Sequence, residues 1–358
     1  MPILCSNPSA DFKPYSEEVL DRIQEIASGG SYILGAEVSS FEKEFADYIG
    51  QSFGVGVANG TDGIELALRC CNLEPGDEVI TVSHTASATP TAIVKAGGIP
   101  LFVDIDPETY TLNPDLIEPN LSSRTKAIIP VHIYGHPADM DHIIAIAKSR
   151  NIAVIEDCAQ AVGATISGKQ IGSFGDFSSF SFYPTKNLST LGDAGLVLTD
   201  SIERYERIRA LRQYGWHERF YSSELGLNSR MDELHAAILR VRLKYLDYQN
   251  EQRARIAQRY IECLSSFPIK LPTTTPLSSH VYHLFVIQVE NRDELTSFLN
   301  ARNIYPGIHY PYAAHQQPAF QNRNLTTQLP VTESLYRRCL SLPIYASMTS
   351  DEVNQVID

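Results

Sequence analysis

The sequence lacks the patterns that mark several common classes of protein. None of its six cysteines forms a C-x-x-C pair, so the spacing typical of a structural zinc site is absent. No apolar run approaches the roughly 18 residues of a membrane span. The first residues have no basic region and do not resemble a signal peptide. We therefore expect a soluble, cytoplasmic protein with reduced thiols and no metal site.

Positive charge is also scarce. The chain has 29 Lys and Arg residues against 42 Asp and Glu residues, which gives a net charge of −13. A protein that binds nucleic acid or an anionic membrane needs a basic face, so we expect neither partner. A local basic pocket for a small anion remains compatible with this balance.

What is present is the alternation of an α/β protein. After two N-terminal helices, strands and helices alternate from residue 53, which predicts a mostly parallel sheet covered by helices on both faces. The expected strands are 53–57, 78–82, 100–103, 126–131, 152–155, 177–182 and 195–198, and the expected helices among them are 62–71, 89–96 and 140–150. Ser16 begins the first helix, and Gly50 ends the second, where Ser39 and Glu42 fit a capping box.

The C-terminal part of the chain predicts a smaller unit. A long helical stretch is expected over residues 231–265, and Pro268 and Pro272 follow it. Residues 283–358 have the pattern of a second α/β unit. With 358 residues, two domains are expected. We place a large domain at 1–245 and a small domain at 246–358.

Two residues near the strand ends could carry chemistry. Asp157 ends an apolar strand, at the edge where open α/β sheets bind ligands. Lys186 follows another strand and Pro184. A buried lysine can form a Schiff base. Taken singly, Asp157 could equally be a helix cap and Lys186 a solvated loop residue.

A third segment completes a recognisable set. Asn59-Gly60-Thr61-Asp62 lies between a strand and a helix, where backbone N–H groups can hold a phosphate, although an ordinary turn fits as well. It matches neither the dinucleotide-binding glycine pattern nor a P-loop. Pyridoxal phosphate (PLP) needs a lysine, a carboxylate for its ring nitrogen and donors for its phosphate. The sequence offers candidates for all three.

These segments resemble the DegT/DnrJ/EryC1/StrS group of PLP-dependent sugar aminotransferases. The resemblance covers nearly the whole chain, and its most specific parts are Val57–Asp62, Glu156–Ala161, Gly172–Asp176, Phe180–Asn187, Gly192–Gly195, Gly226–Met231, Ile308–Pro311 and Ser341–Tyr345. It implies fold type I, with a large domain built on a mostly parallel mixed sheet and a smaller C-terminal α/β domain. It also implies PLP as cofactor.

The resemblance assigns roles to the cofactor residues. Lys186 would bind PLP covalently and shuttle the proton, and Asp157 would keep the pyridine nitrogen protonated. Gln160 would lie near the phenolic oxygen, and His84 would stack on the ring. The phosphate would be held by Gly60, Thr61 and Ser181, with Asp62 nearby. Asn228 would reach the cofactor phosphate of a second subunit, which implies a homodimer with shared active sites.

The implied reaction transfers an amino group, with L-glutamate as the expected donor, to a nucleotide sugar in amino-sugar biosynthesis. The segments 212–219 and 228–237 resemble the branch that acts at C3 of dTDP-linked keto-6-deoxyhexoses. The sugar nucleotide would be positioned by Tyr183, His309 and Tyr310, and Arg219 is a further candidate for its diphosphate. Alternatives are a 4-keto sugar aminotransferase, a PLP-dependent sugar dehydratase, which typically has His in place of Lys186, and a non-catalytic regulator.

Overall fold

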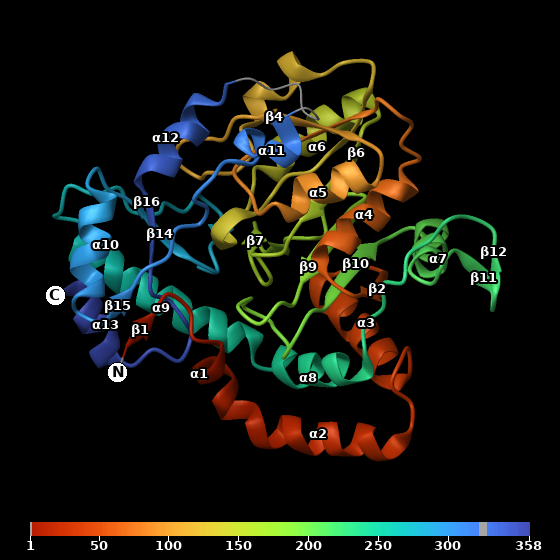
Figure 1. Ribbon diagram of the computed structural model, residues 1–358, viewed down its shortest axis with the longest axis horizontal. Helices are drawn as coiled ribbons and strands as arrows, with labels where there is room; N and C mark the ends of the chain where they lie inside the picture. Colours follow the sequence, from red (N-terminus) through yellow and green to blue (C-terminus); the bar gives the residue numbers. More distant parts are fainter. Residues whose placement is uncertain (1, 322–327) are drawn as a thin grey trace.

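The computed structural model describes residues 2–321 and 328–358, and a seven-stranded sheet forms its centre (Figure 1). The strand order is β2-β10-β9-β6-β5-β3-β4. β10 runs antiparallel to both of its neighbours, whereas the other neighbouring pairs are parallel. The bounds are β2 (Phe53–Val57), β3 (Glu78–Val82), β4 (Ile99–Val103), β5 (Thr125–Ile128), β6 (Ala153–Asp157), β9 (Phe177–Ser181) and β10 (Gly195–Thr199).

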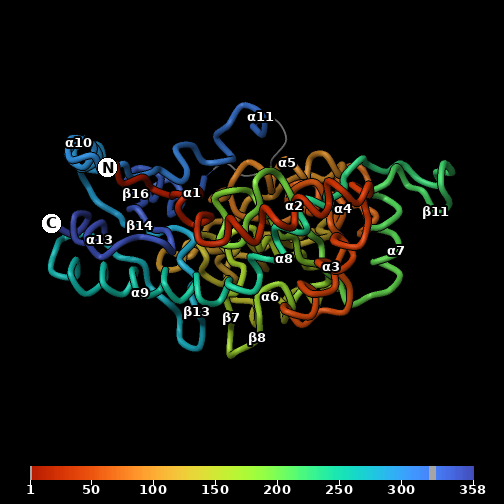
Figure 2. The backbone as a smooth tube through the Cα atoms, turned by 90° about the horizontal axis from the view of Figure 1, so that it is seen from below, coloured from red at the N-terminus to blue at the C-terminus, as the bar shows by residue number. Residues whose placement is uncertain are grey.

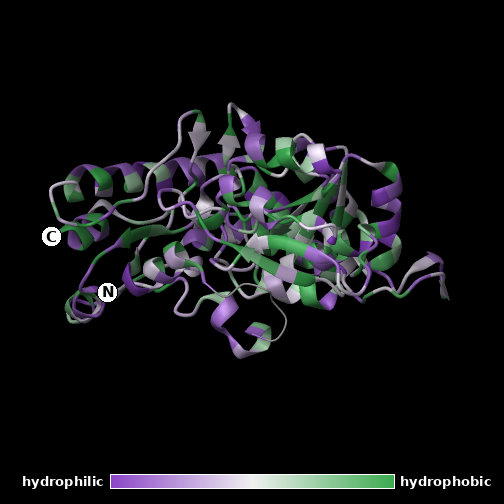
Figure 3. Cartoon of the chain, turned by 90° about the horizontal axis from the view of Figure 1, so that it is seen from above, coloured by the Kyte–Doolittle hydropathy of each residue, from purple (hydrophilic) through white to green (hydrophobic). Residues whose placement is uncertain are grey.

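Helices cover both faces of this sheet, because successive residues of each strand point to opposite sides. In β6, Val154 packs into one apolar core and Ile155 into the other. The first core is shared with α3 (Ala36–Ile49), α6 (Met140–Arg150) and α8 (Glu233–Leu243), and the second with α4 (Gly60–Cys70), α5 (Ala88–Lys95) and α7 (Ile202–Leu211). Figure 3 shows the apolar strands in the middle of the molecule. The predicted α/β fold is confirmed.

The N-terminal helices begin and end largely as the sequence predicts. After α1 (Pro8–Phe12), α2 runs over Ser16–Gly29 and α3 ends before Gly50, which is left-handed. The predicted capping box is wrong, because α3 begins at Ala36 and Ser39 lies inside it. The Glu233 carboxylate of α8 instead accepts from the backbone N–H groups at the start of α3.

Two other expected elements are shorter in the structure. The stretch 231–265 forms two helices, α8 and α9 (Leu246–Leu264). Both begin in the first core, and the later turns of α9 pack into a different one. The strand expected at 126–131 ends at Ile128. Pro130 follows closely, and its missing amide hydrogen prevents a regular ladder there.

The C-terminal part of the chain has an apolar core of its own, to which α9 contributes Ile256, Ala257 and Tyr260. The elements that follow α9 in the chain are β14 (Phe285–Gln288), α10 (Arg292–Asn300), β15 (Ile304–Tyr305), α11 (Pro318–Gln321), α12 (Pro330–Arg338), β16 (Cys339–Leu342) and α13 (Ser350–Ile357). Of these, α11 and α12 pack against the central sheet instead, because Phe320 lies with Phe102 of β4 and Leu335 enters the first core. The N-terminal strand β1 (Ile3–Leu4) pairs with β15 (Figure 1). The first residues therefore lie with this unit, and not with the large domain in which we expected them.

Short strands complete the structure. β7 (Thr165–Ile166) lies between β8 (Lys169–Gln170) and β13 (Ser278–Ser279). β11 (Trp216–Glu218) and β12 (Tyr221–Ser222) form a hairpin that projects from the body of the chain in both Figure 1 and Figure 2. Within residues 2–321 and 328–358, no helix combines the length and the apolar character that crossing a membrane requires.

Candidate active site

The predicted site segments meet at one edge of the central sheet. Asp157 and Ser181 end the neighbouring parallel strands β6 and β9, and Gly60 follows β2 after a short turn. His84 comes directly after β3. Because the carboxyl ends of these strands lie at the same edge, the topology brings together residues that are far apart in the sequence.

A cradle for an anion lies where β2 leads into α4. The Asn59 side chain caps this helix by accepting from the N–H of Asp62 at 2.9 Å. The N–H groups of the first helical turn have no intrahelical acceptor, and the helix dipole favours negative charge there. A Cβ on Gly60 would lie 3.0 Å from the Cβ of Ser181, so the two segments approach closely only because residue 60 is glycine. These features suit a phosphate group.

Asp62 anchors the loop that carries Asn228. The Ser229 hydroxyl donates to the Asp62 carboxylate at 2.8 Å and accepts from the N–H of Ala58 at 3.0 Å. Lys95 lies 3.5 Å from another Asp62 oxygen. Asn228 itself is exposed in the single chain. Its contact with the cofactor of a second subunit stays a prediction.

Asp157 is buried, and both of its carboxylate oxygens are held. Oδ2 accepts from the Thr89 hydroxyl of α5 at 2.8 Å, and Oδ1 accepts from the backbone N–H of Ala159 at 3.2 Å. Thr85 lies 2.9 Å from Thr89, oxygen to oxygen. The carboxylate is thus fixed at the end of β6, where the sequence predicts a partner for a ring nitrogen.

Lys186 lies half-buried beyond the end of β9. Burial lowers the pKa of its amine to about 8, and the charge of Asp157 opposes part of this shift. The neighbouring Asn187 fixes the loop, because its amide donates to Asn250 of α9 at 2.8 Å and to the Val281 carbonyl at 3.0 Å. The lysine is therefore a more available nucleophile than an exposed one.

Two histidines adjoin Lys186, and both are held in the neutral form. Burial lowers the pKa of His283 and of His309, and the positive charge of Lys186 adds to the effect. His283 Nδ1 lies 3.2 Å from Asn187 Oδ1, and His309 Nδ1 lies 2.9 Å from Ser341 Oγ. These rings can exchange hydrogen bonds with a substrate without adding charge to the site.

Gln160 links the sheet edge to the C-terminal unit. Its Oε1 accepts from the N–H of Tyr134 at 2.7 Å, and its Nε2 donates to the Tyr310 hydroxyl at 2.8 Å. The Tyr134 hydroxyl in turn donates to the His309 carbonyl. Burial raises the pKa of Tyr310 to about 12, so this hydroxyl stays protonated and keeps its own hydrogen to donate.

His84 does not have the surroundings that the sequence predicts. Its ring is fully buried, and its centre lies 5.3 Å from those of Tyr134 and Tyr336. His84 Nε2 is 2.8 Å from the Tyr134 hydroxyl, and burial lowers the pKa of the imidazole to about 3. Because no face of this ring is exposed, the structure does not support the expected stacking on a cofactor. The ring packs the floor of the site instead.

The remaining substrate candidates lie at the surface. The Tyr183 side chain is 49% exposed, and its carbonyl accepts from the N–H of Lys186 at 2.8 Å. Arg219 connects the strands of the β11–β12 hairpin, and its guanidinium lies 4.9 Å from the centre of the Phe220 ring. It lines a cavity of about 670 Å³ together with Arg209 and Arg230. This hairpin projects away from the body of its own chain (Figure 1).

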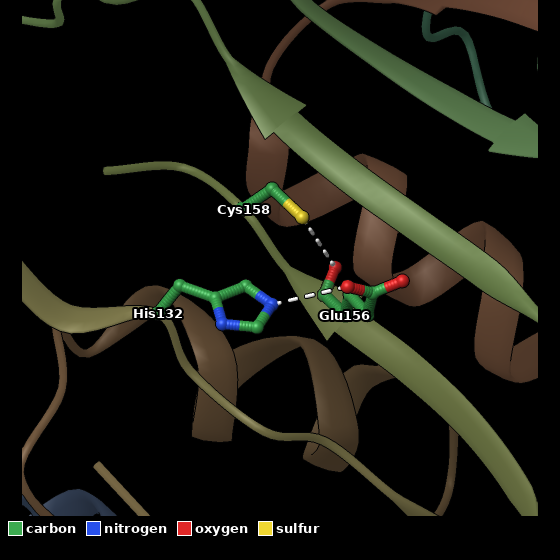
Figure 4. Close-up of side chains that lie close together, drawn as sticks. All are labelled: His132, Glu156 and Cys158. Carbon is green, nitrogen blue, oxygen red and sulfur yellow. Dashed lines mark hydrogen bonds and ion pairs between the residues drawn. The ribbon is translucent and has the colours of Figure 1, made fainter. Parts of the chain in front are cut away.

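A buried cluster behind the site resembles a metal site in composition only. One ligand atom each of His132, Glu156 and Cys158 lies within 4.8 Å of the others (Figure 4). The Glu156 oxygens already accept four N–H groups, which come from His132 and from the backbone of Gly172, Phe174 and Gly175. Burial raises the pKa of the Cys158 thiol well above its usual value. With its carboxylate fully used, this cluster supports the strand that carries Asp157 and needs no ion.

The sequence as a whole matches one protein family. Residues 14–358 match the DegT/DnrJ/EryC1/StrS aminotransferase family. The chain belongs to this family. It is 42% identical to the UDP-N-acetyl-3-dehydro-α-D-glucosamine 3-aminotransferase of Acidithiobacillus ferrooxidans, over 97% of this chain and 94% of that protein. It is 44% identical to the dTDP-3-amino-3,6-dideoxy-α-D-galactopyranose transaminase of Aneurinibacillus thermoaerophilus, over 96% and 94%.

Solved structures of the family agree with this fold. The crystal structure of Streptomyces venezuelae DesV in complex with a ketimine intermediate superposes with a TM-score of 0.97, at 41% identity, and covers 100% of this chain and 97% of that one. As a member of the DegT/DnrJ/EryC1/StrS family, the protein is a PLP-dependent sugar aminotransferase of fold type I.

The residues at the sheet edge fit this cofactor. A lysine with a lowered pKa, a buried carboxylate and a helix N-terminus beside Ser181 are the groups that PLP requires. Sequence reasoning missed Thr89, Tyr134 and Asn187, which hold Asp157, Gln160 and the loop of Lys186. Thr89 could have been noticed as a hydroxyl in the first turn of a helix that follows a site strand, but its partner is 68 residues away.

Proposed function

We propose that the enzyme transfers an amino group from L-glutamate to C3 of a dTDP-linked 3-keto-6-deoxyhexose. The observation that carries the transfer chemistry is the joint placement of Lys186, Asp157 and the cradle at Gly60 on one sheet edge. The choice of sugar is supported by the 44% identity to the Aneurinibacillus transaminase, whose name specifies a 3-amino-3,6-dideoxy sugar linked to dTDP.

In this proposal, Lys186 and Asp157 divide the chemistry. Bound PLP supplies an electron sink for the carbon that loses or gains a proton. Asp157 would accept a hydrogen bond from the protonated ring nitrogen and so keep that sink effective. Lys186 would bind the cofactor through its neutral amine and, once the amino donor has displaced it, would hold and move the proton at the reacting carbon. Its lowered pKa makes the neutral form accessible near physiological pH.

We assign the sugar to the side of the site that the C-terminal unit closes. Tyr310 and His309 come from that unit and are both neutral, and Tyr183 lies exposed just after Ser181. Neutral hydroxyl and imidazole groups match the hydroxyl groups of a deoxyhexose. A sugar carboxylate would instead favour a cation.

A second copy of the chain would complete the site. Asn228 and Arg219 are exposed in one chain, and the β11–β12 hairpin projects into solvent. The same chain exposes large apolar side chains before α3 and around this hairpin, namely Tyr32, Ile33, Phe220, Tyr221 and Leu225. We propose that these surfaces meet in a homodimer, in which Asn228 reaches the partner's cofactor phosphate and Arg219 the substrate diphosphate.

The substrate can be tested in the reverse direction. The PLP form of the enzyme is mixed with dTDP-3-amino-3,6-dideoxyhexoses, with dTDP-4-amino-4,6-dideoxyhexoses and with UDP-linked 3-amino sugars. A true substrate removes the visible absorbance of the cofactor and yields the keto sugar, which mass spectrometry detects. The proposal expects the dTDP-linked 3-amino sugar to react fastest. Preferential reaction of a 4-amino sugar would contradict the assigned position.

A second candidate is transfer to a UDP-linked 3-keto sugar. The 42% identity to the Acidithiobacillus aminotransferase, whose printed substrate is UDP-linked, favours it specifically. The same panel separates the two, because the sugars of that arm differ in the nucleotide, in the C2 substituent and in the hydroxyl group at C6. Lys186 argues against the sugar dehydratase alternative. A regulator without catalysis would leave every member of the panel unchanged.

A further inference from the structure

Thr89, in the first turn of α5, and Thr85, in the loop before this helix, form a chain of hydroxyl groups that ends on Asp157. Thr89 Oγ1 lies 2.8 Å from Asp157 Oδ2, and Thr85 Oγ1 lies 2.9 Å from Thr89 Oγ1. All three side chains are buried, with at most 5% of their surface exposed. Neither threonine was assigned a role by the sequence, and neither belongs to the cofactor cradle at Gly60.

The direction of this chain follows from the chemistry of its ends. An ionised carboxylate can only accept, so Thr89 donates its single hydroxyl hydrogen to Asp157. The Thr89 oxygen is then the acceptor for Thr85. Each hydroxyl points toward the carboxylate, and the outer bond polarises the inner one.

The remaining contacts of Asp157 make Thr89 its main side-chain support. Oδ1 accepts one backbone N–H, from Ala159, at 3.2 Å. Across the described part of the chain, no ion pair involves Asp157. A buried carboxylate without hydrogen bonds is costly, so the bond from Thr89 offsets part of that cost and fixes the plane of the group.

We propose that Thr89 is a positioning residue for catalysis. Supported by Thr85, it would hold Asp157 so that a remaining lone pair faces the N–H of the PLP pyridine ring. This inference rests on the proposed role of Asp157. A merely structural threonine looks different: Thr81, equally buried in β3, donates to the Ile129 carbonyl at 2.9 Å and not to a charged group.

The test compares cofactor binding in matched variants. Thr89→Val removes the hydroxyl at nearly constant volume, Thr89→Ser retains it, and Thr81→Val is the control for a buried threonine outside the site. Each variant is stripped of PLP and titrated with PLP, and both the dissociation constant and the visible spectrum are recorded. The titrations are repeated for each variant in the presence of Asp157→Asn, so that Thr89→Val and Asp157→Asn form a double-mutant cycle.

We expect Thr89→Val to weaken PLP binding about tenfold, the loss of one modest hydrogen bond to a charged group, and to shift the visible band of the bound cofactor. Thr89→Ser and Thr81→Val should remain close to the parent. With Asp157→Asn already present, Thr89→Val should add little. Thr85→Val should show the same effect in weaker form.

Two results would overturn the inference, and they distinguish a failure of the role of Thr89 from a failure of the role of Asp157. If Thr89→Val weakens binding equally with and without Asp157→Asn, the threonine acts through packing alone, and the role of Asp157 stands. If Asp157→Asn by itself leaves affinity and spectrum unchanged, the proposed role of Asp157 fails first. Should Thr89→Val not fold, Thr89→Ala compared with Thr89→Ser gives the same contrast.

Discussion

Replacing Glu156 with glutamine should destabilise the protein by about 3–6 kcal/mol, although the two side chains have nearly the same shape. The Glu156 carboxylate is fully buried and accepts four N–H groups. Oε1 accepts from Phe174 and Gly175 at 2.7 and 2.8 Å, and Oε2 accepts from Gly172 at 2.9 Å and from His132 at 3.2 Å. These bonds tie the turn 172–175 to the strand that carries Asp157.

The magnitude follows from the number of donors left without an acceptor. A glutamine amide has one oxygen, so two of the four N–H groups would face its NH2 group in either orientation. His132 cannot relieve this by changing its tautomer, because its Nδ1 already accepts from the N–H of Ala138 at 2.9 Å. Two lost hydrogen bonds to a charged group, each worth about 1.5–3 kcal/mol, give the predicted total.

Urea denaturation measures this loss directly. Unfolding is followed by circular dichroism at fixed protein and PLP concentrations, since both affect apparent stability. Glu290→Gln is the matched control, because that carboxylate is 81% exposed and pairs with Arg338 at the surface. We expect the control to change stability by less than about 1 kcal/mol.

The reasoning would be refuted if Glu156→Gln and Glu290→Gln cost the same. That result would mean that the turn 172–175 relaxes and finds other acceptors. A large loss with an unchanged cofactor spectrum would show that Glu156 stabilises the fold without affecting Asp157. Addition of a chelator should leave the stability of the parent protein unchanged, because the Glu156 carboxylate of the His132 cluster already accepts four N–H groups.

Three further predictions concern the site itself. Because burial lowers the pKa of Lys186 to about 8, PLP incorporation into the apoenzyme should accelerate as pH rises through 8; a rate that first rises near pH 10, as for an exposed lysine, contradicts this. When Lys186→Ala and Asn228→Ala chains are mixed, the mixture should regain activity that neither variant has alone. If the subunits are shown to exchange and no activity returns, the active site is not shared between two chains. Tyr183→Phe, His309→Gln and Tyr310→Phe should each lower kcat/KM for the sugar nucleotide at an unchanged cofactor spectrum, whereas parental values in all three would place the sugar elsewhere.

The sequence by itself determined the order and type of the main elements. Alternating strands and helices predicted the sheet, and helix ends such as Gly50 were visible because a left-handed cap favours glycine. The motifs around Lys186 and Asp157 indicated the family and its cofactor. These patterns each extend over a few neighbouring residues, so they can be interpreted without knowing which distant residues come into contact.

The tertiary structure decided everything that depends on distant partners. Glu233 caps α3 from about 200 positions away, so the local Ser39–Glu42 pattern predicted the wrong start. Residues 231–265 form two helices, and the later turns of α9 enter a core that α8 does not contact.

The same holds for the site. The family resemblance implied that His84 stacks on the cofactor ring, yet the structure buries this ring among tyrosines. Thr89 meets Asp157 only because α5 packs against the sheet at the end of β6, 68 residues away in the chain. Sequence motifs therefore determined which groups the site contains, and the order of strands in the sheet decided which side chains hold them in place, because that order alone sets distances between residues far apart in the sequence.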